Sequence, residues 1–304
     1  MQIIYMHVKI ALMHFANTIL VPGITAGALY ALIAIGFTVL FRTTGVLNFA
    51  QGEMVMLGPM AVLIIHQKWG LPVWLGFVGA IVFVAAFALL EERLAVRPYL
   101  QSGVQVPWIL STLGASIILA ELLTIPFRGE GVPFPYGAST APHTYLGIQL
   151  ATTDIIMIVA PIALVGLLHL FYTRTRLGLM SMAIADDPDG ALAIGISKKR
   201  MSQLAALMAG MVALITGLVL APTQLVNPTL GITYLFNGFV GAAIGGLGSL
   251  SGALVGCLAV GVLGQLSSNY IGSLYVNATL FAVLLLVYLA RPYGIFGRPP
   301  VRAV

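Results

Sequence analysis

The stretch FANTILVPGITAGALYALIAIGFTVLF, residues 15–41, contains no charged side chain. A helix needs about 20 predominantly apolar residues to cross the hydrocarbon core of a bilayer. The length and composition of this stretch therefore predict a membrane-spanning helix. Lys9 is the only lysine or arginine before this stretch, and no small-residue cleavage motif follows it. We therefore expect a retained first span rather than a cleaved secretory signal.

The rest of the chain has the same character. Hydrophobic residues occupy 60% of the 304 positions and charged residues 8%, against about 25% charged residues in an ordinary soluble domain. The mean hydropathy is +1.03. We therefore expect an all-α, polytopic transmembrane helical bundle. Its apolar runs lie approximately at 15–41, 52–66, 72–90, 107–126, 154–172, 201–221, 232–247, 250–266 and 274–290.

The number of spans depends on two of these runs. The run at 52–66 is short, and the two runs that flank Gly248 could be halves of broken helices. The sequence therefore predicts eight or nine spans.

Lysine and arginine residues indicate which way the spans face, because cytoplasmic loops are enriched in both. Three of the 14 basic residues, Lys9, Lys68 and Arg128, fall on one side when successive spans alternate. The other eleven fall together on the opposite side, and they are Arg42, Arg93, Arg97, Arg174, Arg176, Lys198, Lys199, Arg200, Arg291, Arg298 and Arg302. We expect the second side, with the C-terminus, to be cytoplasmic, and the N-terminus to lie outside.

Several kinds of site have no counterpart in the sequence. Cys257 is the only cysteine, so neither a disulfide framework nor a cysteine metal cluster is possible. The phosphate-loop pattern G-x-x-x-x-G-K-[ST], the zinc pattern H-E-x-x-H and the G-x-S-x-G elbow are absent. We therefore predict no catalytic residue, no bound metal or cofactor and no ATP hydrolysis in this chain. The net charge of +5 is explained by topology, so we expect no nucleic-acid partner.

Glycines four residues apart predict close helix packing. They share one helix face, where a neighbouring backbone can approach. The packing residues predicted in this way are Gly241, Gly245, Gly248, Gly252 and Gly256.

The longest cytoplasmic loop, at about 173–200, contains the start and stop residues of a short helix. Asp187 can cap it, Pro188 suits its first position and Gly195 suits a left-handed C-terminal cap. Ser197 can then cap the next span. Two interpretations stay open at this point: a helix lying on the lipid surface, or a docking element for a cytoplasmic partner.

Two polar stretches interrupt the apolar runs. Asn48, Gln51 and Glu53 follow Arg42, and polar groups within a membrane are a hypothesis for a functional site. The alternative is a position at the interface, with Glu53 solvated or paired with an arginine. The second stretch, 91–98, is predicted to be a solvated turn between spans.

Five segments, in order, resemble the inner-membrane permease of branched-chain amino acid ABC importers over nearly the whole chain. They are GALYALIAIGFTVLFRTTGVLNFAQGEMVMLG (27–58), EERLAVRP (91–98), ADDPDGALAIGIS (185–197), GAAIGGLGSLSGALVG (241–256) and RPYGIFGRP (291–299). The loop begins with Asp-Asp-Pro-Asp, whereas a Glu-Ala-Ala start is common in ABC permeases, and the branched-chain permeases themselves diverge there.

The resemblance implies a single transmembrane permease domain over 1–304 in a bacterial inner membrane. It implies a second related permease in a heterodimer, two cytoplasmic ATPases that bind ATP-Mg, and a periplasmic binding protein. The substrates would be branched-chain amino acids or related small amino acids and amides. The segment seated on an ATPase would comprise Ala185, Asp186, Asp187, Pro188, Asp189, Gly190, Ala191 and Gly195. Asn48, Gln51 and Glu53 would influence the translocation path or its gate.

A secondary transporter driven by an ion gradient is the competing hypothesis. Such a transporter needs acidic groups in the middle of the membrane, and the central spans largely lack them.

Overall fold

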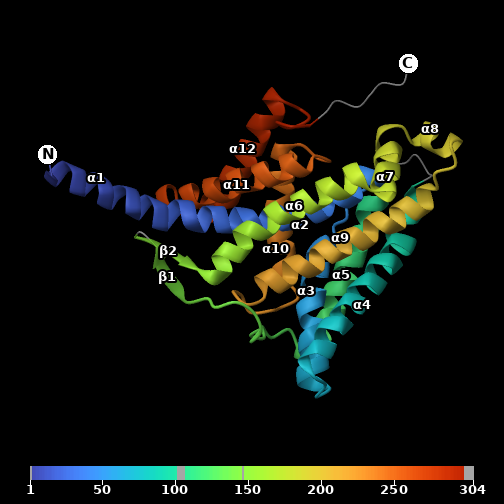
Figure 1. Cartoon of the computed structure of the whole chain (residues 1–304), viewed down its shortest axis with the longest axis horizontal. Coiled ribbons are helices and arrows are strands. Elements are labelled where there is room, and N and C mark those ends of the chain that lie inside the picture. The colour runs from blue at the N-terminus through green and yellow to red at the C-terminus, as the bar shows by residue number, and fades with distance from the viewer. Residues whose placement is uncertain (1, 101–106, 146, 298–304) are drawn as a thin grey trace.

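The computed structural model describes residues 2–100, 107–145 and 147–297, and helices dominate it (Figure 1). Of the basic residues discussed above, Arg298 and Arg302 lie outside the described residues. The α-helices are α1 (Gln2–Phe15), α2 (Val21–Thr44), α3 (Gln51–Leu63), α4 (Val73–Glu91), α5 (Pro107–Phe127), α6 (Thr152–Arg174), α7 (Arg176–Asp186), α8 (Pro188–Ala193), α9 (Lys198–Leu220), α10 (Leu230–Gly245), α11 (Leu250–Tyr270) and α12 (Val276–Ala290).

Short turns and one hairpin complete the described elements. Strands β1 (Pro142–Tyr145) and β2 (Ile148–Ala151) pair antiparallel, with Pro142 opposite Ala151. The π-helical turns are η1 (Ala16–Leu20), η2 (Ile64–Lys68) and η3 (Glu92–Val96), and the 3₁₀ turns are η4 (Arg97–Tyr99) and η5 (Ser273–Tyr275).

The predicted all-helical, multi-span architecture is confirmed. Among the described residues, seven helices are long and apolar enough to cross a membrane. They are Tyr5–Thr44, Val73–Tyr99, Pro107–Phe127, Thr152–Arg174, Lys198–Leu220, Leu250–Tyr270 and Ser273–Ala290. The run predicted at 232–247 forms the shorter helix α10, and the run at 52–66 forms α3 and η2. Among the described residues, seven long helices and the shorter α10 give seven or eight candidate spans, at the lower end of the predicted eight or nine.

The first helix begins well before the predicted span at 15–41. One continuous helical segment runs through α1, η1 and α2, because residues 2–14 are mostly apolar and contain neither proline nor glycine. The π-helical turn η1 contains Asn17, whose side chain donates to the Gly147 carbonyl oxygen at 3.0 Å and accepts from the Gln149 N–H at 2.9 Å. The loop that carries the hairpin is therefore fixed to the first helix.

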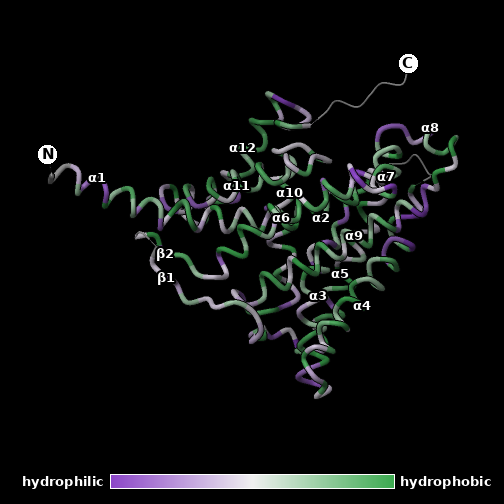
Figure 2. The backbone as a smooth tube through the Cα atoms, viewed as in Figure 1, coloured by the Kyte–Doolittle hydropathy of each residue, from purple (hydrophilic) through white to green (hydrophobic). Residues whose placement is uncertain are grey.

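Helix α2 forms the centre of the bundle. It contacts α6, α9, α10 and α11, and Leu32, Ile33 and Phe37 are among its fully buried side chains. A helix that is apolar on all sides belongs inside a protein or a membrane. Figure 2 shows this apolar character along most helices, with hydrophilic residues gathered near α7 and the start of α9.

Four of the five predicted packing glycines lie where α10 meets α11. A Cβ atom at Gly245 would overlap the Gly252 carbonyl oxygen, and one at Gly256 would overlap the Gly241 carbonyl oxygen. Gly248 is different: it lies in the turn between the helices with φ +87°, and a Cβ atom there would come no closer than 3.8 Å to Phe41. The prediction for Gly248 is therefore wrong, because this glycine provides a left-handed turn and not a helix face.

Candidate functional site

The loop between α6 and α9 contains two helices. The predicted short helix is α8: the Asp187 carboxylate accepts from the Gly190 N–H at 3.0 Å, Pro188 is its first residue, and Gly195 has φ +88°. The Ser197 hydroxyl accepts from the Arg200 N–H at 3.5 Å and caps α9. The local signals for the start and end of a helix were therefore sufficient here.

Helix α7 was not predicted. Its cap is Thr175, whose hydroxyl accepts from the Gly178 N–H at 3.0 Å. A Cβ atom at Gly178 would overlap the Phe171 carbonyl oxygen and lie 2.7 Å from the Tyr172 Cα atom. Gly178 thus allows α7 to turn tightly against the end of α6, and α7 places α8 beyond the ends of the spans (Figure 1).

Helix α8 has one buried side and one exposed apolar side. Ala191 is buried in a small cluster with Ile184 and Met201. Leu192 in α8 and Ile194, the residue directly after this helix, are 49% and 76% exposed. An exposed apolar pair on a rigidly capped helix is typical of a helix that inserts into a partner's groove.

The remaining residues of the predicted coupling segment surround this pair. Asp186, Asp187, Pro188, Asp189 and Gly195 are exposed, whereas Ala185 and Gly190 are partly buried. The sequence predicted the short helix, but it did not indicate which of its apolar side chains, Leu192 and Ile194 among them, are exposed.

A cavity of about 1080 Å³ lies beside this loop. Its walls come from the end of α2, from α6 and α7, and from the turn between α10 and α11, and they include Arg42, His169, Asp186 and Lys198. The Arg42 guanidinium lies 5.1 Å from the centre of the Tyr172 ring, a favourable cation–π geometry. The loop therefore adjoins the end of the central helix α2.

The three predicted path residues lie in the interior of the bundle. The Asn48 side chain donates to Glu91 Oε2 at 2.9 Å and accepts from the Ala50 N–H at 2.8 Å. The Gln51 amide donates to the Ala209 carbonyl oxygen at 3.0 Å. Glu53 lies beside the Ser116 hydroxyl and is 2% exposed. These contacts join the start of α3 to α4, α5 and α9. Within the described residues, Glu53 is neither exposed to solvent nor paired with an arginine.

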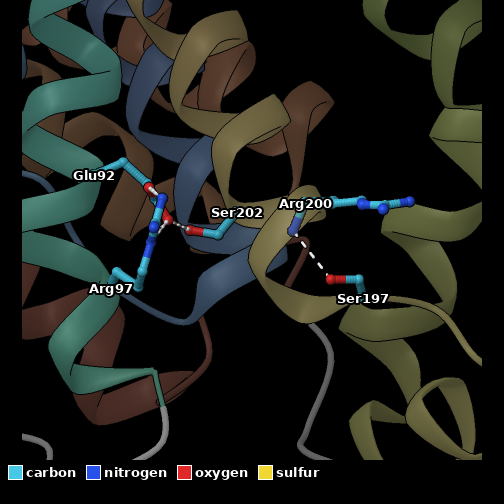
Figure 3. A network of polar contacts seen from close by, with 5 residues as sticks. All are labelled: Glu92, Arg97, Ser197, Arg200 and Ser202. Atoms are coloured by element: carbon cyan, nitrogen blue, oxygen red, sulfur yellow. Dashed lines mark hydrogen bonds and ion pairs between the residues drawn. The ribbon is translucent and has the colours of Figure 1, made fainter.

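The interpretation of 91–98 as a solvated turn is wrong. Glu91 and Glu92 are 5% and 0% exposed, because η3 continues α4 against α9. Glu92 accepts from the Ser202 hydroxyl at 2.9 Å and from Arg97 Nε at 3.2 Å, and it forms an ion pair with Arg97 (Figure 3). The sequence could not show these contacts, since Ser202 is 110 positions away.

Several oxygen atoms in this interior have no partner within the described residues. They are Glu53 Oε2, Glu91 Oε1 and Gln51 Oε1. Burying a polar group without a partner costs free energy. The hydrogen bond from Asn48 is the main interaction that offsets this cost for the Glu91 carboxyl.

We expect Asn48→Leu to destabilise the chain by about 1–3 kcal/mol, because it leaves a buried carboxyl without its donor. The double variant Asn48→Leu/Glu91→Leu should recover part of that loss, since replacing both partners by apolar groups can be nearly neutral. Thermal unfolding of the wild type, both single variants and the double variant in detergent gives the coupling energy. Strictly additive effects would show that the two side chains act independently.

Comparison with known proteins identifies the family. Residues 19–289 match the family model described as branched-chain amino acid transport system / permease component. The chain is 33% identical over 297 residues to the high-affinity branched-chain amino acid transport system permease protein LivH of Escherichia coli K12, covering 93% of this chain and 96% of the relative. It is 32% identical over 302 residues to BraD of Pseudomonas aeruginosa, covering 94% and 97%.

The similarity extends to an archaeal protein, the probable branched-chain amino acid transport permease protein LivH of Methanocaldococcus jannaschii, with 26% identity over 307 residues. The family match covers well over half of the chain, and the bacterial relatives align along almost their full length. The chain therefore belongs to the family of permease components of branched-chain amino acid ABC transport systems, in which separate subunits hydrolyse ATP.

Proposed function

We propose that the chain is one of two related permeases in an ATP-driven importer, and that it forms part of the path for branched-chain amino acids or related small amino acids and amides. Its other partners are two cytoplasmic ATPases, which bind ATP-Mg, and a periplasmic binding protein that delivers substrate. The second permease is a different chain, so the permease pair is a heterodimer. The whole chain, 1–304, acts as a single transmembrane domain.

The basic side of the molecule faces the cytoplasm in this proposal, together with the C-terminus, and the N-terminus is periplasmic. Arg42, Arg97 and Lys198 support this orientation, because they lie at neighbouring helix ends around two adjacent cavities. An excess of lysine and arginine marks the cytoplasmic side of membrane proteins. Lys68, at the opposite end, lies 4.7 Å from the centre of the Phe127 ring.

The exposed apolar pair on α8 is the observation that carries the coupling role. Leu192 and Ile194 enter a groove of an ATPase, while the surrounding residues 185–191 and Gly195 hold the helix in position. Movement of the ATPases on binding ATP displaces α8. Because α7 is packed against the end of α6, the displacement reaches the spans and drives alternating access.

The buried residues act on the path by positioning helices. Asn48, Gln51 and Glu53 fix the start of α3 against α4, α5 and α9, so a shift of one helix is transmitted to the others. The glycine contact between α10 and α11 keeps these two helices together as one body.

Transport by liposomes tests the proposal against ion-gradient coupling. The chain is reconstituted with its candidate permease partner, the two ATPases and the binding protein, and uptake of labelled leucine is measured. We expect uptake with ATP and ionophores present, and none with a non-hydrolysable ATP analogue. The buried Glu53 and Glu91 are the kind of group that an ion-coupled carrier would use. Accumulation on a proton or sodium gradient without the ATPases would therefore contradict the proposal.

A further inference from the structure

A second cavity, of about 320 Å³, lies at the basic side between the end of α4 and the start of α9. It is lined by Arg93, Arg97, Pro98, Leu100, Lys198 and Lys199. Four of these six residues are cationic. Neither the coupling role nor the translocation path uses this cavity.

Two of the four cations already have partners. Arg97 forms an ion pair with Glu92, and Lys198 Nζ donates to the Leu100 carbonyl oxygen at 2.9 Å. Arg93 and Lys199 are exposed and have no hydrogen-bond or ion-pair partner within the described part of the chain. Since Glu92 neutralises one positive charge, the cavity keeps an excess of about three positive charges.

The cavity lies at the ends of two candidate spans. The candidate span Val73–Tyr99 ends there and the candidate span Lys198–Leu220 begins there, and we expect the ends of spans at the level of the lipid headgroups. The start of α9 adds the partial positive charge of a helix N-terminus. A phosphate group at this level would meet two unpaired cations and a favourable helix dipole.

Exposed apolar side chains lie on α4 and on η3, the elements that lead to this cavity. Phe83 and Leu90, seven residues apart on one side of α4, are 48% and 52% exposed, and Leu94 in η3 is 64% exposed. Leu94 is next to Arg93 in the chain. The surface therefore offers apolar contact for acyl chains directly beside a cationic pocket for a headgroup.

From this combination we propose that the cavity binds the phosphodiester headgroup of an anionic phospholipid in the cytoplasmic leaflet. Arg93 and Lys199 contact the phosphate, Arg97 and Lys198 contribute charge from fixed positions, and the acyl chains lie along Phe83, Leu90 and Leu94. Basic pockets between membrane helices on this side are suited to such headgroups. The inference does not depend on the coupling role of α8.

Native mass spectrometry of the full-length chain in detergent tests the site, with phosphatidylglycerol titrated against phosphatidylcholine. The double variant Arg93→Ala/Lys199→Ala should bind phosphatidylglycerol about 30-fold more weakly, as expected for the loss of two surface cations. Arg174→Ala/Arg176→Ala is the matched control, because both side chains are exposed on the same basic side outside the cavity. The control should retain wild-type binding.

Three results would overturn the proposal. Equal loss in both double variants would show diffuse electrostatic attraction and no site. Binding of inorganic phosphate that phosphatidylglycerol does not displace would show a site for a free anion. Weaker association with the ATPases and unchanged lipid binding in Arg93→Ala/Lys199→Ala would show a protein contact. The single variants Arg93→Gln and Lys199→Gln replace the double variant if its thermal unfolding differs from that of the wild type.

Discussion

Replacing Gly256 by alanine is expected to destabilise the chain by about 3 kcal/mol, at the upper end of the usual range for overpacking. The added Cβ atom would overlap the Gly241 carbonyl oxygen and lie 2.8 Å from the Gly245 nitrogen atom. Both neighbours are backbone atoms, so no side-chain rotation can make room. The helices α10 and α11 would have to separate, and close backbone contact is the main attraction between helices in lipid.

Gly264→Ala provides the matched control in the same helix. Its Cβ atom would lie 3.7 Å from Val276 Cγ1, an ordinary contact. Alanine is favoured over glycine inside a helix by about 0.5–1 kcal/mol, so this variant should be as stable as the wild type or slightly more stable. Thermal unfolding in detergent and size-exclusion profiles measure both. If the two variants melted at the same temperature, the α10–α11 contact could not be a major source of stability.

The glycine pattern also shows how far sequence reasoning extends. A spacing of four residues predicted a packed face, and Gly241, Gly245, Gly252 and Gly256 lie in it. Gly248 has the same spacing, yet it lies in a turn. Spacing describes which residues would share a face if the helix were continuous. It does not show where the helix breaks.

Local features were predicted better than distant ones. The caps of α8 depend on residues a few positions apart, and Asp187, Pro188 and Gly195 were sufficient to predict this helix. The contacts of Asn48 with Glu91 and of Gln51 with Ala209 join residues 43 and 158 positions apart. A single sequence contains no information on such pairs, which is why its charged residues at 91–98 predict a solvated turn where the structure has a buried cluster.

Burial on α8 could not be predicted for the same reason. Ala191, Leu192 and Ile194 are all apolar, so their residue types alone do not separate the buried residue from the exposed ones. Their burial differs because Ile184 from α7 and Met201 from α9 cover only one side of the short helix.

The double variant Leu192→Asp/Ile194→Asp is expected to abolish ATP-driven uptake in the reconstituted importer. Burying a leucine or isoleucine side chain contributes about 1.5–3 kcal/mol, so losing two such contacts should weaken ATPase binding at this site at least 100-fold, or about 3 kcal/mol. A buried aspartate adds a further desolvation cost. Leucine uptake and co-purification of the ATPases are the measurements.

The structure makes this variant more informative than a deletion of the loop. Leu192 is half exposed and Ile194 is largely exposed, so their replacement should change the thermal unfolding of the isolated chain little. Ala191→Asp would instead introduce a charge into the cluster with Ile184 and Met201 and destabilise the chain. The conservative variant Leu192→Val/Ile194→Val keeps the surface apolar and should retain most of the uptake. Normal ATP-driven uptake in the aspartate variant would rule out α8 as the contact with the ATPase. If the aspartate variant bound the ATPases fully but did not transport, the defect would follow docking. Coupling would then depend on the packing of α7 against α6 and not on the exposed pair.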